Sequence, residues 1–98
     1  MVRYSKAEAR AWARDNMRGL CNVVIPSYTL DLKRLNEKGI RHDIRKEIEM
    51  GFWGTLLVSE TAITLDEYRQ FIQWSHDEAA GKLTLVHHAL FNTLEENI

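Results

Sequence analysis

Residues 51–71, GFWGTLLVSETAITLDEYRQF, contain one complete unit of a strand followed by a helix. The run WGTLLVS is short, apolar and uncharged, which is typical of a strand buried on both faces of a parallel sheet. Thr64 and Glu67 then have the spacing of a capping box, in which each side chain bonds the other residue's backbone amide at a helix start. The stretch therefore predicts a strand that leads into a helix ending at Gly81.

Similar apolar runs occur on both sides of this unit. LCNVVIP (residues 20–26) is rich in β-branched side chains and stops at Pro26, and LTLVHHA covers residues 83–89. Each has the length and composition of a strand, and LCNVVIP is expected to be buried on both faces. The single cysteine, Cys21, lies in the first run and is expected to be buried as a small apolar residue.

Helical spacing fills the gaps between these runs. Ile40, Ile44 and Ile48 recur at helical intervals before Gly51, which predicts a second helix with an apolar inner face. Acidic and basic side chains are interleaved in this region, which favours a solvent-exposed helix face over a basic patch. They are Asp31, Lys33, Arg34, Glu37, Lys38, Arg41, Asp43, Arg45, Lys46, Glu47 and Glu49.

Two more capping boxes mark the ends of the chain. Ser5 and Glu8 predict an N-terminal helix that ends at Gly19, and Thr93 and Glu96 predict that a further helix begins there. The predicted organisation is an N-terminal helix in residues 1–19 and three strand–helix repeats in residues 20–98.

Strict alternation of strands and helices predicts an α/β fold with parallel strands and right-handed crossovers. A complete (β/α)₈ TIM barrel typically needs about 250 residues. With 98 residues, the chain is expected to form a partial barrel.

Composition excludes several classes of function. The formal net charge of −1 gives no overall attraction to nucleic acid or to an anionic membrane. No apolar run is long enough to span a membrane, and the charged N-terminal region does not resemble a secretory signal. A lone cysteine allows no internal disulfide, so a cytoplasmic protein is expected.

The order and spacing of several short motifs resemble the dihydrodipicolinate synthase / N-acetylneuraminate lyase family. The matching features are Gly19, Pro26, LNEKGI (residues 35–40), EMGFWGTLLVSE (49–60), ITLDEYRQF (63–71) and LVHHALFNTLEENI (85–98). The resemblance implies a (β/α)₈ barrel that binds pyruvate or another 2-oxo acid as a Schiff base on a lysine of the sixth strand. A tyrosine of the fifth strand relays protons in that family.

Both of those family residues would lie beyond Ile98, so the resemblance implies no catalytic residue in this chain. The family's carboxylate-binding Gly-Thr-Thr-Gly-Glu loop corresponds here to the shorter VSETAIT (residues 58–64), which lacks both glycines. The Gly-Thr-Gly that is usual after the third strand corresponds to HHAL (residues 87–90).

In a barrel, the chemistry lies at the carboxyl ends of the strands. That rule gives a candidate substrate pocket, although Glu60 and Thr61 are also explained as the loop that leads to the Thr64 cap. The candidates are Tyr28, Ser59, Glu60, Thr61, His88 and Asn92.

Adjacent His87 and His88 should point to opposite faces of a strand, so they are not expected to bind one ion. No metal site and no cofactor are expected. Asn22 interrupts the first apolar run, either as a polar group of the barrel interior or, more commonly, as a hydrogen-bonded core residue.

The predicted function is the N-terminal part of a Schiff-base lyase of the aldolase type, inactive by itself. The alternative is a non-catalytic α/β module that acts by association. The expected partners are a small 2-oxo acid in a full-length parent and either further copies of the chain or the remainder of a barrel.

Overall fold

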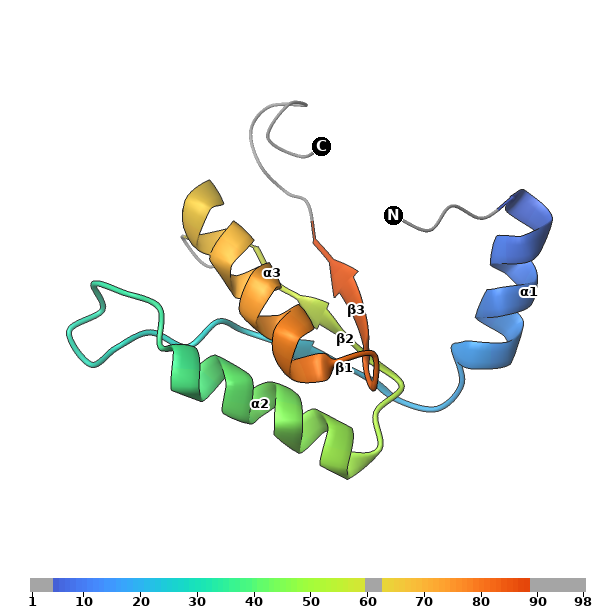
Figure 1. The fold of residues 1–98 in the computed structure, drawn as a ribbon, viewed down its shortest axis with the longest axis horizontal. Coiled ribbons are helices and arrows are strands. Elements are labelled where there is room, and N and C mark those ends of the chain that lie inside the picture. The colour runs from blue at the N-terminus through green and yellow to red at the C-terminus, as the bar shows by residue number, and fades with distance from the viewer. Residues whose placement is uncertain (1–4, 60–62, 89–98) are drawn as a thin grey trace.

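The computed structural model describes residues 5–59 and 63–88, and these residues form an α/β fold (Figure 1). Helices and strands alternate along the chain, as the sequence predicts. The elements in order are α1 (Lys6–Asn16), β1 (Cys21–Val24), α2 (Glu37–Met50), β2 (Gly54–Leu57), α3 (Leu65–Ala79) and β3 (Thr84–His87).

The three strands form one parallel sheet in the order β1-β2-β3. Val23 of β1 is paired with Leu56 of β2, which is paired in turn with Val86 of β3. Consecutive strands joined through a helix are therefore neighbours in the sheet. This arrangement confirms the predicted fold class and is consistent with part of a (β/α)₈ barrel.

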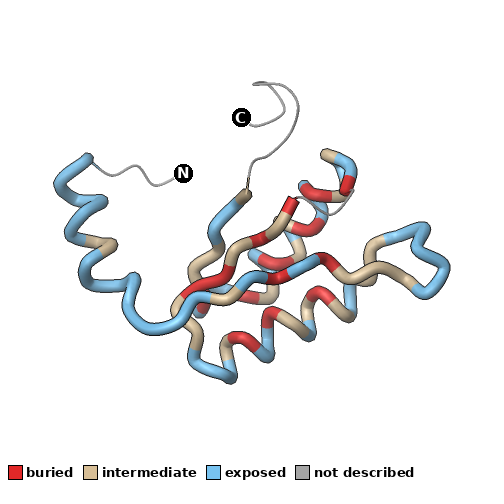
Figure 2. The backbone as a smooth tube through the Cα atoms, turned by 180° about the vertical axis from the view of Figure 1, so that it is seen from behind, coloured by how far each residue is buried: buried red, intermediate tan, exposed pale blue. Residues whose placement is uncertain are grey.

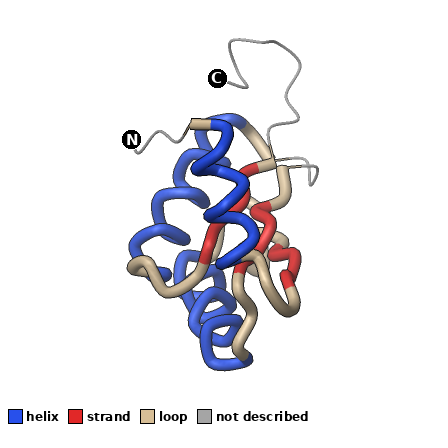
Figure 3. Tube along the Cα trace, turned by 90° about the vertical axis from the view of Figure 1, so that its right-hand side faces the viewer, coloured by secondary structure: helices blue, strands red, loops and turns tan. Residues whose placement is uncertain are grey.

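Helices α2 and α3 pack against each other and lie on the same side of the sheet (Figures 1 and 3). Side chains of a strand alternate between its faces. Val24, directed at the helices, is only 4% exposed, whereas Val23 and Ile25 on the other face are 52% and 60% exposed. Figure 2 shows the molecule from behind, with buried and exposed positions mixed along the strands.

Burial of β1 on both faces is therefore a wrong prediction for the described part of the chain. No described segment covers the second face of the sheet, which leaves Val23 and Ile25 in solvent. Cys21 is exposed for the same reason, so its predicted burial is also wrong. Its thiol still has a raised pKa, because of partial desolvation and the nearby Glu47 carboxylate.

Two predicted capping boxes are present. Ser5 with Glu8 and Thr64 with Glu67 each make the reciprocal pair of hydrogen bonds between side chain and backbone. Helix α1 is shorter than predicted, because it ends at Asn16 rather than at Gly19. The capping box predicted at Thr93 lies outside the described residues.

The core lies between the two packed helices and the sheet. Its fully buried apolar side chains are Ile40, Ile44, Leu57 and Phe71. Helix α1 contributes no buried residue and stands apart from the other elements (Figure 1). The sheet and helices α2 and α3 therefore position the candidate sites.

Candidate functional site

Hydrogen bonds tie the carboxyl ends of β2 and β3 together. The Tyr68 hydroxyl of α3 donates to the Leu57 carbonyl oxygen over 2.6 Å and accepts from the His88 backbone N–H over 2.9 Å. The Ser59 hydroxyl donates to the His88 carbonyl oxygen. Burial raises the pKa of the Tyr68 phenol, so the hydroxyl keeps its proton at neutral pH and can donate.

His88 has an imidazole nitrogen without a partner at this edge. Its Nδ1 atom is buried and has no hydrogen-bond partner among the described residues. A buried polar atom without a partner costs free energy, and such atoms mark candidate positions for a bound ligand or water. Ser59 and His88, both predicted as pocket residues, are therefore brought together in the structure.

Tyr28 lies in the loop that follows β1, where it is bridged to Leu35 in antiparallel fashion. Its buried hydroxyl has no hydrogen-bond partner within the described ranges. Desolvation raises the pKa of this phenol, and the Glu67 carboxylate raises it further. Tyr28 is thus close to the first turn of α3, and no hydrogen bond joins its side chain to Ser59 or His88 in this part of the chain.

The remaining predicted pocket residues, Glu60, Thr61 and Asn92, lie outside the described residues. Of the predicted pocket residues, the structure therefore describes Tyr28, Ser59 and His88, and a hydrogen bond joins Ser59 to His88.

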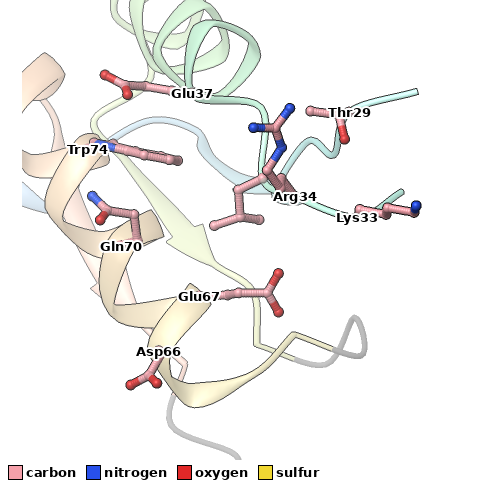
Figure 4. A pocket seen from close by; sticks show the side chains of 9 residues that line it. Thr29, Lys33, Arg34, Glu37, Asp66, Glu67, Gln70 and Trp74 are labelled. Carbon is pink, nitrogen blue, oxygen red and sulfur yellow. The ribbon is translucent and has the colours of Figure 1, made fainter. Parts of the chain in front are cut away.

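A hollow of about 540 Å³ lies between the loop after β1 and helix α3 (Figure 4). Trp74 and Gln70 of α3 lie opposite Arg34 of the loop, and charges of both signs surround the opening. The lining residues are Thr29, Lys33, Arg34, Leu35, Glu37, Asp66, Glu67, Gln70 and Trp74.

Among the described residues, the predicted pocket residues Tyr28, Ser59 and His88 do not line this hollow, although Thr29 follows Tyr28 directly. The hollow depends on how residues 28–36 fold back. Thr29 donates its backbone N–H to the Arg34 carbonyl, and Leu32 takes a positive φ of 63°. No sequence motif predicts either this hydrogen bond or this backbone conformation, so the sequence did not indicate Arg34 or Trp74 as site residues.

A second polar cluster lies under the sheet. Glu47 of α2 is only 4% exposed, and its Oε1 atom accepts hydrogen bonds from Asn22 of β1 over 2.6 Å and from Thr55 of β2 over 3.3 Å. Its Oε2 atom is buried without a partner among the described residues. Asn22 is therefore hydrogen-bonded on the helix side of the sheet, as the second alternative has it, but it is half-buried rather than part of the core. A solvent-exposed Glu47 is a wrong prediction.

The position of Glu47 was visible in the helical spacing. It lies three residues after Ile44 and seven after Ile40, so it shares their inward face. Burial raises the pKa of its carboxyl, the hydrogen bonds from Thr55 and Asn22 oppose that rise, and the Asp43 carboxylate adds to it. Glu47 is thus an acid whose charged form is disfavoured by its surroundings.

Replacing Glu47 separates the charge from the hydrogen bonds. Glu47→Gln keeps an acceptor for Asn22 and Thr55 but removes the charge, so the variant should be at least as stable as the wild type at pH 7. Glu47→Ala leaves two donors unpaired and should be destabilised by about 1–3 kcal/mol. Urea denaturation of both variants measures these differences.

The pH dependence provides the control. A raised folded-state pKa means that the folded wild type binds more protons than the unfolded chain just above pH 4.5, so its stability falls as the pH rises through that window. Any advantage of Glu47→Gln should therefore shrink from pH 7 to pH 4. The opposite result would be a Glu47→Gln variant that is less stable than the wild type at pH 7, by a difference in unfolding free energy that does not change with pH. It would show that burial does not disfavour the charged carboxylate.

Within residues 5–59 and 63–88, no helix is both long enough and apolar enough to cross a membrane. These residues also contain no group of three or more His, Cys, Asp or Glu side chains arranged to hold a metal ion.

No protein-family model matches the chain. Over 82 residues, it is 29% identical to 4-hydroxy-tetrahydrodipicolinate synthase of Methanopyrus kandleri. The match covers 80% of this chain but 27% of that protein, so the chain spans about a quarter of the length of this curated relative. The similarity agrees with the family resemblance of the sequence motifs, while the activity in the name is that of the relative.

Proposed function

We propose that the chain supplies strand–helix units of a barrel of the aldolase type, which acts on a small 2-oxo acid through a Schiff base. The observation that carries this proposal is the similarity over 82 residues to 4-hydroxy-tetrahydrodipicolinate synthase. Three parallel strands in sequential order, with both crossover helices on one side, support it.

In this proposal, the carboxyl ends of the strands contribute polar groups to the substrate pocket. Ser59 and His88 lie at the ends of β2 and β3, and the Tyr68 hydroxyl keeps these ends at a fixed separation. The unpartnered His88 Nδ1 is suited to hydrogen bonding with a carboxylate or carbonyl group of the substrate, as donor or acceptor according to its tautomer. Glu60, Thr61 and Asn92 are proposed for the same pocket.

The chain alone is proposed to be inactive, because its lysines are badly placed for Schiff-base chemistry. A Schiff-base lysine must lose its proton, which burial in a pocket promotes. The lysines of this chain are exposed on helices or in turns where the structure describes them. They are Lys6, Lys33, Lys38, Lys46 and Lys82.

Trapping with pyruvate and borohydride tests the proposal. Borohydride reduces a Schiff base to a stable secondary amine, so mass spectrometry detects one attached pyruvyl group per reactive lysine. The isolated chain should gain none. A chimera in which this chain replaces the matched region of the Methanopyrus kandleri protein should be labelled, because the chain then completes the barrel.

The chimera must first give a cooperative thermal transition, which separates misfolding from lack of reactivity. A folded chimera that is not labelled would contradict the proposal. An adduct on the isolated chain would show that the chain is active by itself.

The exposed side of the sheet favours a second candidate function, a non-catalytic module that acts by association. Val23, Ile25 and Val86 all expose apolar surface. Under this alternative, the chain binds further copies of itself, and the chimera gives no Schiff base even when it is folded.

A further inference from the structure

His76 and His87 approach each other outside the site described above. His76 lies in the last turn of α3 and His87 is the last residue of β3. Their Nε2 atoms are 3.1 Å apart, and the rings stand edge to face at 82° with centroids 5.3 Å apart. Both side chains are exposed to solvent, so an ion can reach them from solution.

Rigid elements hold this pair in place. Helix α3 packs against β3, and the turn between them is fixed by the buried side chain of Leu83 and by a hydrogen bond from the Lys82 N–H to the Ala79 carbonyl. Ligands on rigid elements lose little conformational entropy when they bind an ion. The histidines are thus already positioned for a shared ligand.

We propose that His76 and His87 form a two-histidine binding site for a divalent transition-metal ion such as Zn²⁺. Two imidazole nitrogens bound to the same tetrahedral Zn²⁺ at about 2.0–2.1 Å from the metal lie about 3.4 Å apart. The observed separation of 3.1 Å is only slightly shorter, so the ion fits beside the line that joins the two nitrogens once each ring has turned its Nε2 lone pair toward it.

The protonation states suit this role. In the hydrogen-bonded pair, one neutral ring donates from Nε2 and the other accepts. When the ion binds, the donor ring moves its proton to Nδ1, so both Nε2 lone pairs face the metal and the net charge of the rings does not change.

The site has two protein ligands, because no third His, Cys, Asp or Glu joins the pair within the described residues. Water completes the coordination of the ion, as expected for an open site rather than a closed structural one. Imidazole ligands also suit Cu²⁺ and Ni²⁺, and Cu²⁺ should bind more tightly than Zn²⁺. The proposed ligands are therefore His76 and His87, and not the adjacent residues His87 and His88 that the sequence analysis considered.

Calorimetric titration of the untagged chain with Zn²⁺ tests the proposal, alongside the variants His76→Gln and His87→Gln. We expect one ion per chain. Each single variant should bind Zn²⁺ at least roughly tenfold more weakly than the wild type. Loss of a residue that only hydrogen-bonds to a metal ligand already costs that much, and here a ligand itself is lost. The double variant should lose little more than either single variant, because a lone imidazole retains little affinity.

His42→Gln is the matched control, since His42 is an exposed histidine on α2. It should bind Zn²⁺ like the wild type. In the wild type, nitrogen NMR of the imidazoles should show shifts at Nε2 of His76 and His87 on addition of Zn²⁺, which tests the site without any substitution. Unchanged affinity in both single variants, or equal shifts at His42, would overturn the proposal.

Discussion

Phe71→Ala should remove most of the stability of the folded chain. Phe71 is fully buried at the centre of α3, where its ring meets Tyr68 edge to face with centroids 6.1 Å apart. Truncating a buried phenylalanine leaves a cavity and costs about 3–5 kcal/mol. Whole domains are stable by only about 5–15 kcal/mol, and this core is small, so the variant should be largely unfolded at 37 °C.

Urea denaturation followed by circular dichroism measures the loss, at equal protein concentration for every variant, because any association adds to stability. Gln73→Ala is the control on the exposed side of the same helix and should change stability by no more than about 0.5 kcal/mol. If the urea concentration at the midpoint of unfolding were the same for Phe71→Ala as for the wild type, the result would show that α3 does not pack on the sheet through Phe71.

Local patterns in the sequence predicted the secondary structure well. A capping box needs only two residues three positions apart, and Thr64 with Glu67 makes both of its hydrogen bonds. The end of α1 was harder to predict, because Gly19 takes a positive φ only after the helix has already ended at Asn16. A glycine marks a possible helix stop, but other residues can end the helix sooner.

Burial was harder to predict than secondary structure, because it depends on which layers are present. LCNVVIP reads as a strand with two covered faces, yet the described helices cover only the face that carries Val24. Glu47 illustrates the opposite error, since its charge concealed a position on the buried helix face. Both mistakes come from judging side chains by residue type without knowing their neighbours.

The candidate sites were predicted only in part for a related reason. Ser59 and His88 could be placed together, because parallel strands have their carboxyl ends at the same edge of a sheet. The pairing of His76 with His87 joins a helix to a strand 11 residues away, and it depends on the path of the turn between them. Sequence spacing contains no rule for such a contact.

The second large effect concerns the state of the chain in solution. Val23, Ile25 and Val86 expose apolar surface on the side of the sheet that no described helix covers. Soluble monomers seldom leave large contiguous apolar patches in water. Among the described residues, β1 has a neighbouring strand on one edge only, and its other edge adds a template for strand pairing. We therefore expect the isolated chain to associate with itself.

Val23→Lys should weaken this association, because it places a charge on the exposed sheet face of an edge strand. Leu30→Lys is the matched control. Leu30 is fully exposed in the loop after β1, so this variant also exchanges an exposed apolar side chain for lysine, but away from the sheet. Only the Val23 variant should lower the average mass of the particles.

Light scattering of the wild-type chain at micromolar concentration tests most directly whether this sheet needs further elements to cover it. An average mass well above the 11.4 kDa of one chain, lowered by Val23→Lys and not by Leu30→Lys, is the predicted result. A monodisperse monomer that melts cooperatively would contradict the account, because it would show that the three strands and their helices form a complete small domain.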